Sequence, residues 1–409
     1  MDPSNNAKCS HSPVIARSFI VALSQHVAAA GYIRGVPDSL SPPSGATRQS
    51  RRNKLWAPLA LGALIALAIA AILLFSQPTT SPCRGSICLP PKSVIGLHVP
   101  WAIGGPAIER DGTLSQREPE WPDVPVQGIR LWDTRTAWLN LEPRQDLWDF
   151  SNLDAHIEQA RVHGVSDITL VLWGTPRWAA SQVQPTDAPW LGPGSASMPI
   201  DLQDWRDYVQ TVVSRYQGVI TAYEVGNEPN VKAFWTGTDE QLAELVKEAA
   251  QIVHDTDSAA LVVAPAPVVV NSNPQQTRLA NKFWDSMNSQ KNGDPLPASQ
   301  RVDALSFHWY PTAQTKPIEL KALVNQLRNL ARQAGYFNTP LWLTEVNFYN
   351  QGLTADAQKQ KVIRTNRWIR ELKLPRAYWY AWTDLGPQEI MQFVPGSPAA
   401  QGLAASLGQ

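Results

Sequence analysis

The stretch ITAYEVGNEPN, residues 220–230, begins as an apolar, strand-like run and ends in a glutamate held between an asparagine and a proline. Burying a carboxylate without a partner is costly, so a glutamate at the end of such a run needs a reason to be there. A proline disfavours the helical conformation in the residue before it. We therefore expect Glu228 to have extended backbone geometry and to be held rigidly where a strand ends.

Seven other runs of the same kind occur along the chain. Each is short and apolar, which predicts a strand buried on both faces, as in a parallel sheet. These runs are residues 93–101, 128–134, 168–178, 260–268, 302–311, 340–350 and 376–384. Several of the segments between them have apolar residues at helical spacing, namely residues 205–216, 242–253 and 318–334, and a short last helix is expected within 397–408.

Eight strands that alternate with helices predict an α/β fold, a (β/α)8 TIM barrel over residues 93–409. The alternative is an open doubly wound sheet, but the first strand is not followed by the Gly-rich phosphate turn that such sheets use. The sequence also has no P-loop, no zinc-binding H-E-x-x-H motif and no nucleophile elbow. We expect the barrel to work without a cofactor and without a metal ion.

The N-terminal part of the chain predicts a membrane anchor. Residues 55–76 carry no charge, and about 20 apolar residues span a bilayer as a helix. The basic residues before this span place the polar segment 1–54 in the cytoplasm and the barrel outside. A cleaved signal peptide is the alternative, but the apolar run is longer than the usual core of about 7–15 residues and no clear cleavage site follows it. Residues 77–92 form a Pro/Ser/Thr-rich linker.

Composition restricts the partners and leaves two questions open. The 35 basic and 35 acidic residues balance, so nothing indicates nucleic acid as a partner. Three cysteines are too few for a disulfide scaffold at this length; Cys83 and Cys88 could form a small disulfide loop outside the cell or remain free thiols. The 17 tryptophans could fill the core or stack on sugar rings.

Polar and aromatic side chains follow the predicted strands, and in a barrel the chemistry lies at the C-terminal strand ends. Glu228 and Glu345 come from the fourth and seventh strands, so they should face each other across the barrel mouth. Glycoside hydrolysis needs such a pair: one protonated carboxyl assists the leaving oxygen, and one ionised carboxylate attacks or activates water. Their mutual repulsion separates the two pKa values. Glu224 has the same strand parity as Glu228 and is an alternative acid, although it lies deeper and lacks the Asn–Pro setting.

The motifs GNEPN (226–230), HWYP (308–311) and LTEVN (343–347) resemble those of clan A glycoside hydrolases, most closely family 39 and its relatives from bacterial polysaccharide clusters. The resemblance covers residues 93 to about 384. It implies an O-glycosyl hydrolase that retains anomeric configuration, with Glu228 as acid/base and Glu345 as nucleophile.

The same resemblance assigns binding roles to the neighbouring strand-end residues. Asn227 should bond to the sugar 2-hydroxyl, Tyr310 should orient Glu345, and Trp382 should form the floor of the subsite for the reacting sugar. Arg130 either adds positive charge at the nucleophile or is a structural ion-pair partner. The other residues expected to line the cleft are His98, Trp173 and His308, and either histidine could instead be a hydrogen-bonded structural residue.

One departure from family 39 concerns the accessory β-sandwich that its β-xylosidases usually carry, for which we find no pattern. An open groove would then favour internal cleavage of a polymer. Together with the predicted anchor, this indicates a polysaccharide or oligosaccharide substrate at the cell envelope. The alternative function is a non-catalytic barrel that binds carbohydrate or serves as an envelope scaffold.

Overall fold

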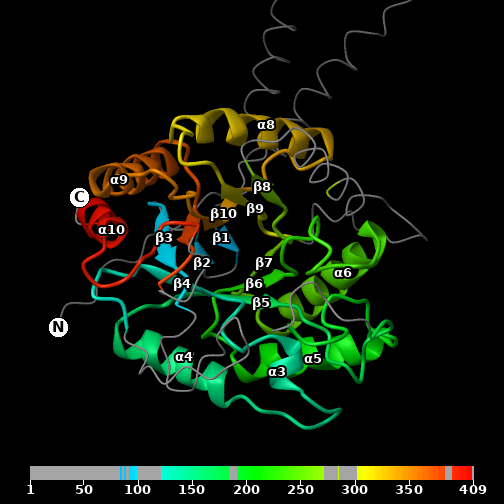
Figure 1. Cartoon of the computed structure of the whole chain (residues 1–409). Coiled ribbons are helices and arrows are strands. Elements are labelled where there is room, and N and C mark those ends of the chain that lie inside the picture. The colour runs from blue at the N-terminus through cyan, green and yellow to red at the C-terminus, as the bar shows by residue number, and fades with distance from the viewer. Residues whose placement is uncertain are drawn as a thin grey trace, which may run out of the picture. The chain divides into compact units, whose positions relative to one another are not determined.

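Parallel strands at the centre and helices around them make up the computed structural model of the chain (Figure 1). The structure describes residues 83–84, 87–88, 92–99, 121–183, 191–270, 284, 302–382 and 389–407. The predicted anchor 55–76 and the predicted cytoplasmic segment 1–54 lie outside these residues. Among the described residues, no helix combines the length and the apolar character that crossing a bilayer requires.

One sheet contains all the strands predicted from the sequence, with trimmed boundaries. Its hydrogen-bonded order is β7-β6-β5-β4-β3-β11-β10-β9-β8, and every pairing is parallel. The strands are β3 (Val94–Leu97), β4 (Gly128–Leu131), β5 (Asp167–Leu172), β6 (Ala222–Val225), β7 (Leu261–Val263), β8 (Val268–Val270), β9 (Leu305–Tyr310), β10 (Leu341–Val346) and β11 (Arg376–Trp379).

The two ends of this order, β7 and β8, belong to one stretch of chain. The predicted strand 260–268 is interrupted at Pro265 and Pro267, because proline has no N–H to give to a strand ladder. A parallel bridge joins Val263 to Ala304, just before β9 begins. The two edges of the sheet are thus linked through this stretch, an arrangement consistent with the predicted (β/α)8 barrel.

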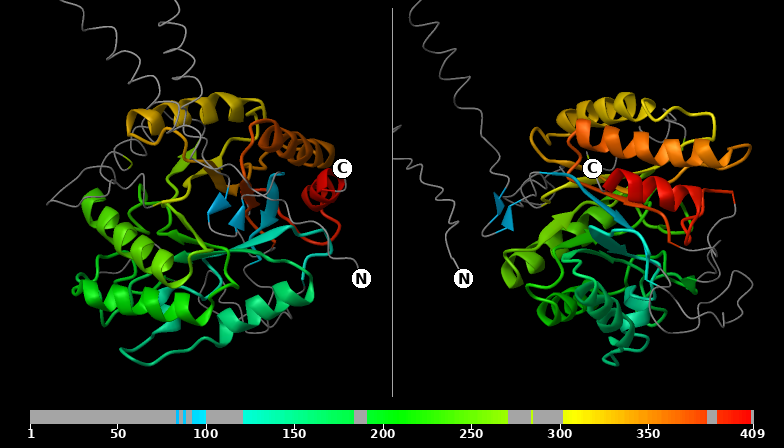
Figure 2. Two further views of the ribbon diagram at one scale, coloured as in Figure 1. Left: turned by 180° about the vertical axis from the view of Figure 1, so that it is seen from behind. Right: turned by 90° about the vertical axis from the view of Figure 1, so that its left-hand side faces the viewer.

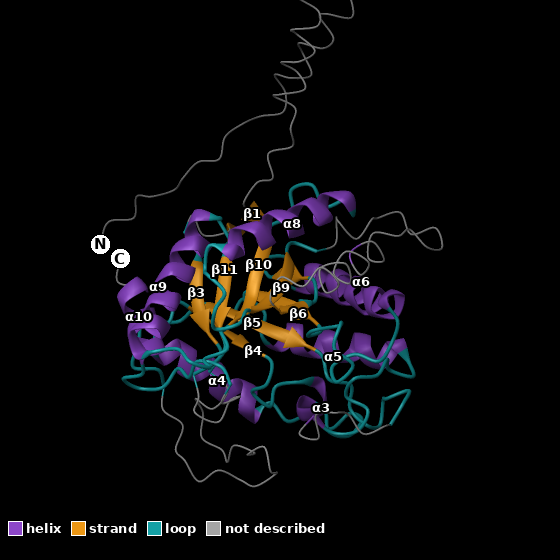
Figure 3. Cartoon of the chain, turned by 45° about the horizontal axis from the view of Figure 1, so that its top comes forward, coloured by secondary structure: helices purple, strands orange, loops and turns teal. Residues whose placement is uncertain are grey.

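The helices lie on the outside of the strands in every view (Figures 2 and 3). The predicted stripe at 242–253 forms α6, whose N-terminus is closed by a capping box between Thr238 and Gln241. The predicted helix 318–334 begins one residue later than expected, since Ile318 is its N-cap and is exposed. The helices are α3 (Trp138–Leu141), α4 (Ser151–Val162), α5 (Leu202–Arg215), α6 (Asp239–Thr256), α8 (Glu319–Gln333), α9 (Ala355–Glu371) and α10 (Pro398–Leu407).

The core follows from burial of the strands on both faces. Every residue of β4, β6, β10 and β11 is buried. Five tryptophans are fully enclosed, which confirms the core-filling interpretation for these: Trp138, Trp284, Trp309, Trp342 and Trp379. At the N-terminal ends of the strands, Arg376 of β11 forms an ion pair with Asp167 of β5, at 2.7 Å. The charge of Arg376 is therefore compensated within the barrel.

A separate two-stranded antiparallel ladder precedes the barrel, formed by β1 (Cys83–Arg84) and β2 (Ile87–Cys88). Its register places Cys83 directly opposite Cys88. Opposed residues in such a ladder have Cα atoms about 4.5–5.5 Å apart, a spacing that a disulfide accepts. The disulfide itself stays a prediction.

Candidate active site

Arg130 of β4 joins two of the predicted site residues to the alternative acid Glu224. Its side chain is fully buried and donates from Nη1 to Glu345 Oε1 at 2.7 Å and from Nη2 to Asn227 Oδ1 at 2.9 Å. Its Nε donates to Glu224 Oε2 at 2.6 Å. A planar guanidinium has the fixed fork of donors that such a three-way contact needs. Arg130 is therefore both an ion-pair partner in the barrel interior and a direct neighbour of the predicted nucleophile.

Glu345 is held on both of its carboxylate oxygens. Besides the bond from Arg130, the Tyr310 hydroxyl donates to Oε2 at 2.6 Å. Leu343 and Glu345 of β10 pair with Phe307 and His308, two consecutive residues of β9. Thr344 between them is therefore an extra residue in the ladder. Such a bulge re-aims side chains. Thr344 and Glu345 can consequently both direct polar groups inward, where strict alternation would send one of them away.

Glu228 lies beyond the end of β6 and corrects one expectation from the sequence. Its backbone φ is 40°, in the left-handed region, and not in the extended geometry expected for a residue before proline. A non-glycine residue in this region is strained, and the surrounding structure must hold it there. Gly226, two residues earlier, has φ 86°, and this tight path lets the chain leave the strand and turn the Glu228 carboxyl toward the barrel mouth.

The two carboxyl groups are close together, as predicted. His308 Nδ1 lies 2.8 Å from Glu228 Oε1 and 3.4 Å from Glu345 Oε2. One ligand atom from each of these three residues lies within 4.8 Å of the others. A cation could fit such a trio, but both Glu345 oxygens already accept bonds from Arg130 and Tyr310. The trio is better suited to sharing protons, and its narrow spacing matches carboxyl pairs about 5 Å apart in retaining glycosidases rather than the wider inverting pairs.

Electrostatics separate the roles of the two glutamates. Burial and then the charge of Glu345 raise the pKa of Glu228 well above its usual range. Burial also raises the pKa of Glu345, to about 7, but the charge of Arg130 and the bond from Tyr310 act in the opposite direction. Glu345 therefore loses its proton first. Burial and the charge of Arg130 hold the pKa of His308 well below its ordinary value, so this ring is neutral beside Glu228.

These shifts predict the pH dependence of any reaction that uses the pair. Activity should rise with pH as Glu345 ionises, with an acidic limb near pH 7, and fall again where Glu228 loses its proton. Initial rates of kcat/KM from about pH 4 to about pH 10 would reveal both limbs. An acidic limb near the ordinary carboxyl value, about 4.3, would show that the Glu345 pocket does not raise its pKa in solution.

Asn227 presents a donor that the protein leaves unused. Its Oδ1 accepts from Arg130, while its buried Nδ2 has no hydrogen-bond partner in the part of the chain that the structure describes. Buried polar atoms are rarely left unpaired unless a ligand or water satisfies them. This geometry fits the predicted bond from Asn227 to a substrate hydroxyl.

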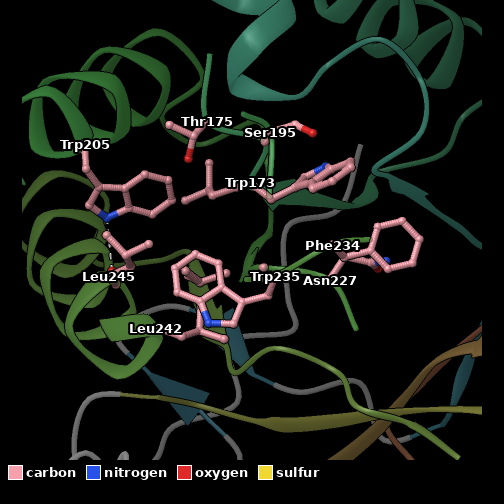
Figure 4. A pocket seen from close by; sticks show the side chains of 13 residues that line it. Trp173, Thr175, Ser195, Trp205, Asn227, Phe234, Trp235, Leu242 and Leu245 are labelled. Carbon is pink, nitrogen blue, oxygen red and sulfur yellow. Dashed lines mark hydrogen bonds between the residues drawn. The ribbon is translucent and has the colours of Figure 1, made fainter. Parts of the chain in front are cut away.

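Trp173 belongs to an aromatic wall beside Asn227. Its ring lies 5.3 Å from that of Trp132 and 6.1 Å from that of Phe234, and its indole N–H donates to the Trp132 carbonyl oxygen. Trp173, Asn227 and Phe234 line a pocket that also contains Trp235 (Figure 4). Sequence patterns placed Trp173 at a strand end, but they gave no indication of Trp132 or Phe234.

Two further predicted binding residues are buried and bonded to the protein itself. His98 is fully buried, its Nε2 donates to the Thr344 carbonyl oxygen at 3.1 Å, and its ring packs against Tyr380. Trp382 is also buried, and its backbone N–H donates to the His98 carbonyl oxygen. The structure therefore places His98 as a support beneath the site. Contact of His98 or Trp382 with a sugar stays a prediction.

Two further carboxyl groups belong to the site. Glu224, weighed above as an alternative acid, is fully enclosed and bonded to Arg130, so it has no access to a leaving group. Asp133, just after β4, accepts a bond from Tyr380 at 2.8 Å, and burial raises its pKa to about 6. Its strand-end position was visible in the sequence, but its partner Tyr380 comes from the far end of the chain and gave no local signal.

Comparison with known proteins identifies a family for the chain. The model of the cellulase family, glycosyl hydrolase family 5, matches residues 155–385, more than half of the chain. No curated protein matches the chain in sequence.

Solved structures resemble the chain in fold. A family 39 glycoside hydrolase from Bacteroides cellulosilyticus WH2 has a TM-score of 0.54 at 14% identity, over 77% of this chain and 64% of that one. An intracellular xylanase from Thermoanaerobacterium saccharolyticum, solved with xylotetraose, has a TM-score of 0.51 at 14% identity, over 76% and 95%. A glucosidase from Croceicoccus marinus has a TM-score of 0.49 at 16% identity. The alignment spans 71% of this chain and 60% of the length of the glucosidase.

Proposed function

The chain belongs to the cellulase family, glycosyl hydrolase family 5, and on this premise we propose that it hydrolyses O-glycosidic bonds in a polysaccharide or oligosaccharide with retention of configuration. Membership of clan A, predicted from the GNEPN and LTEVN motifs, is confirmed. The families of this clan are retaining glycosidases that use two glutamates.

The proposed reaction has two steps. Glu345 attacks the anomeric carbon while Glu228 gives its proton to the departing oxygen, which leaves a glycosyl ester on Glu345. Glu228, now ionised, takes a proton from water; the water oxygen attacks the anomeric carbon and Glu345 is released as a carboxylate. Esterification removes the negative charge of Glu345, so the pKa of Glu228 falls at the moment when Glu228 must act as a base.

The neighbouring residues support these steps. Arg130 and Tyr310 hold both Glu345 oxygens, which fixes the direction of attack and stabilises the anion when it is released. The unused Asn227 donor can bond to the sugar 2-hydroxyl, a contact that strengthens in the transition state.

The observation that carries the proposal is how close three side chains lie: polar atoms of Glu228, His308 and Glu345 are all within 4.8 Å of one another. Arg130 lies beside them and, of the two glutamates, donates a hydrogen bond to Glu345. The test is a panel of envelope, plant and fungal polysaccharides incubated with the protein and analysed for new reducing ends. We expect at least one polymer to be cleaved. Binding without new ends on the whole panel would favour the non-catalytic carbohydrate-binding or scaffold barrel.

Stereochemistry gives an independent prediction. Attack by a carboxylate so close to the acid leaves no room for a water between them, so the first product should keep the anomeric configuration of the substrate. Proton NMR of the first-formed sugar, recorded before mutarotation, distinguishes the anomers. An inverted first product would remove Glu345 from the nucleophile role while leaving hydrolysis itself intact.

Internal cleavage and action at the cell envelope are further parts of the proposal. Action at the envelope is supported by the charge-free segment 55–76 and the basic residues before it, and internal cleavage by the lack of a β-sandwich pattern in the sequence. Reporter fusions placed after Pro90 and before Arg51 should report opposite sides of the membrane. A barrel released into solution without residues 55–76 would instead indicate a cleaved signal peptide.

A further inference from the structure

Below the catalytic pair lies a third glutamate that the reaction itself does not use. We infer that Glu224 is a positioning residue, which fixes Arg130 and withholds part of its positive charge from Glu345. This inference rests on the proposed function, because it assigns Glu224 a task in preparing the nucleophile.

The contacts of Glu224 reach every strand that supplies the catalytic machinery. From its place on β6, Oε2 accepts from Arg130 of β4, and Oε1 accepts from Thr344 of β10 at 3.0 Å. Oε1 also lies 2.9 Å from the hydroxyl of Ser306 on β9, whose single proton it shares with the Ala264 carbonyl oxygen. Glu224 and Arg130 are both completely enclosed. A buried carboxylate with this number of charge-assisted bonds has little freedom to move.

The two hydroxyl donors are adjacent to functional residues in the chain. Ser306 precedes His308 by two positions, and Thr344 directly precedes Glu345. Thr344 is the extra residue of the β10 bulge, so its bond to Glu224 holds the distortion that aims Glu345 inward. Removing Glu224 should therefore loosen the contacts that hold Glu345, and those that hold His308 beside Glu228.

Charge gives the second part of the argument. Arg130 lies between two carboxylates, Glu224 on Nε and Glu345 on Nη1. With Glu224 present, this triad carries one net negative charge when Glu345 is ionised. With glutamine at position 224, the triad would be neutral. The positive charge of Arg130 would then act on Glu345 alone and would favour the ionised form of Glu345. A more strongly compensated Glu345 carboxylate would attract a positively charged transition state less.

Other groups also face Glu345 and stay unchanged in the comparison. The charged and titratable side chains on the surrounding elements are Arg130 and Asp133 from β4 and its end, Glu228 after β6, His308 and Tyr310 of β9, His98 after β3 and Tyr380 after β11. Because none of them is altered in a Glu224 variant, a change in the titration of Glu345 can be attributed to the charge and contacts of Glu224.

The experiment compares Glu224→Gln with Ser306→Ala in the full chain. Ser306→Ala removes a neutral donor from the same carboxylate and keeps its charge. We expect Glu224→Gln to move the acidic limb of kcat/KM to lower pH by about one unit and to lower kcat by about tenfold or more, and Ser306→Ala to leave the limb in place. An unshifted limb in Glu224→Gln would overturn the charge part of the inference.

A second measurement is independent of turnover. In protein labelled at the glutamate carboxyl carbon, the Glu345 signal, identified by its loss in Glu345→Gln, should titrate at lower pH in Glu224→Gln than in the unaltered protein. Absence of hydrolysis in the unaltered protein would refute the proposed function, whereas this titration would still decide the role of Glu224.

If Glu224→Gln does not fold, Glu224→Asp keeps the charge with a shorter reach. It should lower kcat without moving the limb, and an unchanged kcat would refute positioning.

Discussion

Replacement of Glu345 by glutamine is expected to abolish turnover on every substrate, by on the order of 10⁶-fold, the scale seen when a catalytic nucleophile is removed. Glutamine has nearly the same shape but cannot form the glycosyl ester. Leaving-group quality should not matter, because the first step itself is lost. The measurement is kcat on a natural polymer and on an aryl glycoside with a good leaving group.

The control for this loss is Glu158→Gln on α4. Glu158 is largely exposed and pairs only with Arg161 on the same helix, so this change should leave kcat within about twofold. Glu345→Gln should also remain folded, since the glutamine oxygen can accept from Arg130 and its NH2 group can donate to the Tyr310 hydroxyl oxygen. A folded Glu345→Gln protein that retains substantial activity would mean that another group attacks the sugar.

Replacement of Glu228 by alanine is expected to have an effect that depends on the leaving group. On natural polymer, loss of proton transfer should cost about 10²–10⁴-fold in kcat/KM. An activated aryl glycoside needs little assistance to leave, so its first step should persist and the glycosyl ester on Glu345 should accumulate. A burst of released phenol followed by slow turnover would be the kinetic sign.

Added azide provides the test that separates the two roles. A small anion does not need a base, so it should enter the space left by the Glu228 side chain and attack the glycosyl ester. The expected product is a glycosyl azide with the configuration of the substrate. Full activity of Glu228→Ala on natural polymer would refute the acid role. A glycosyl azide of inverted configuration would mean that the two glutamates must exchange roles.

Much of the fold could be predicted because burial determines which positions of a strand or helix are apolar. The runs that become β3 to β11 are mostly apolar and almost entirely buried, and α5, α6 and α8 carry apolar residues at helical spacing. The order of the strands followed from their alternation with helices. The interruption of the fifth predicted strand at Pro265 and Pro267 could also be explained from the residues, since proline gives up a ladder bond.

The composition of the candidate site could be predicted for the same reason, because a barrel brings its strand ends together. The hydrogen bonds within the site could not be predicted. The bulge at Thr344 depends on how β10 pairs with β9, and the triple contact of Arg130 depends on three strands that are far apart in the chain. The rule for residues before proline led to the wrong backbone geometry at Glu228, because contacts from distant segments override a local preference.

The left-handed backbone of Glu228 sets two properties of this position against each other. Glycine would adopt a φ of 40° without strain, and asparagine would adopt it more easily than glutamate. Replacing Glu228 by either residue would relieve backbone strain and would also remove the carboxyl group. Backbone stability and the proposed acid role therefore make opposite demands on position 228.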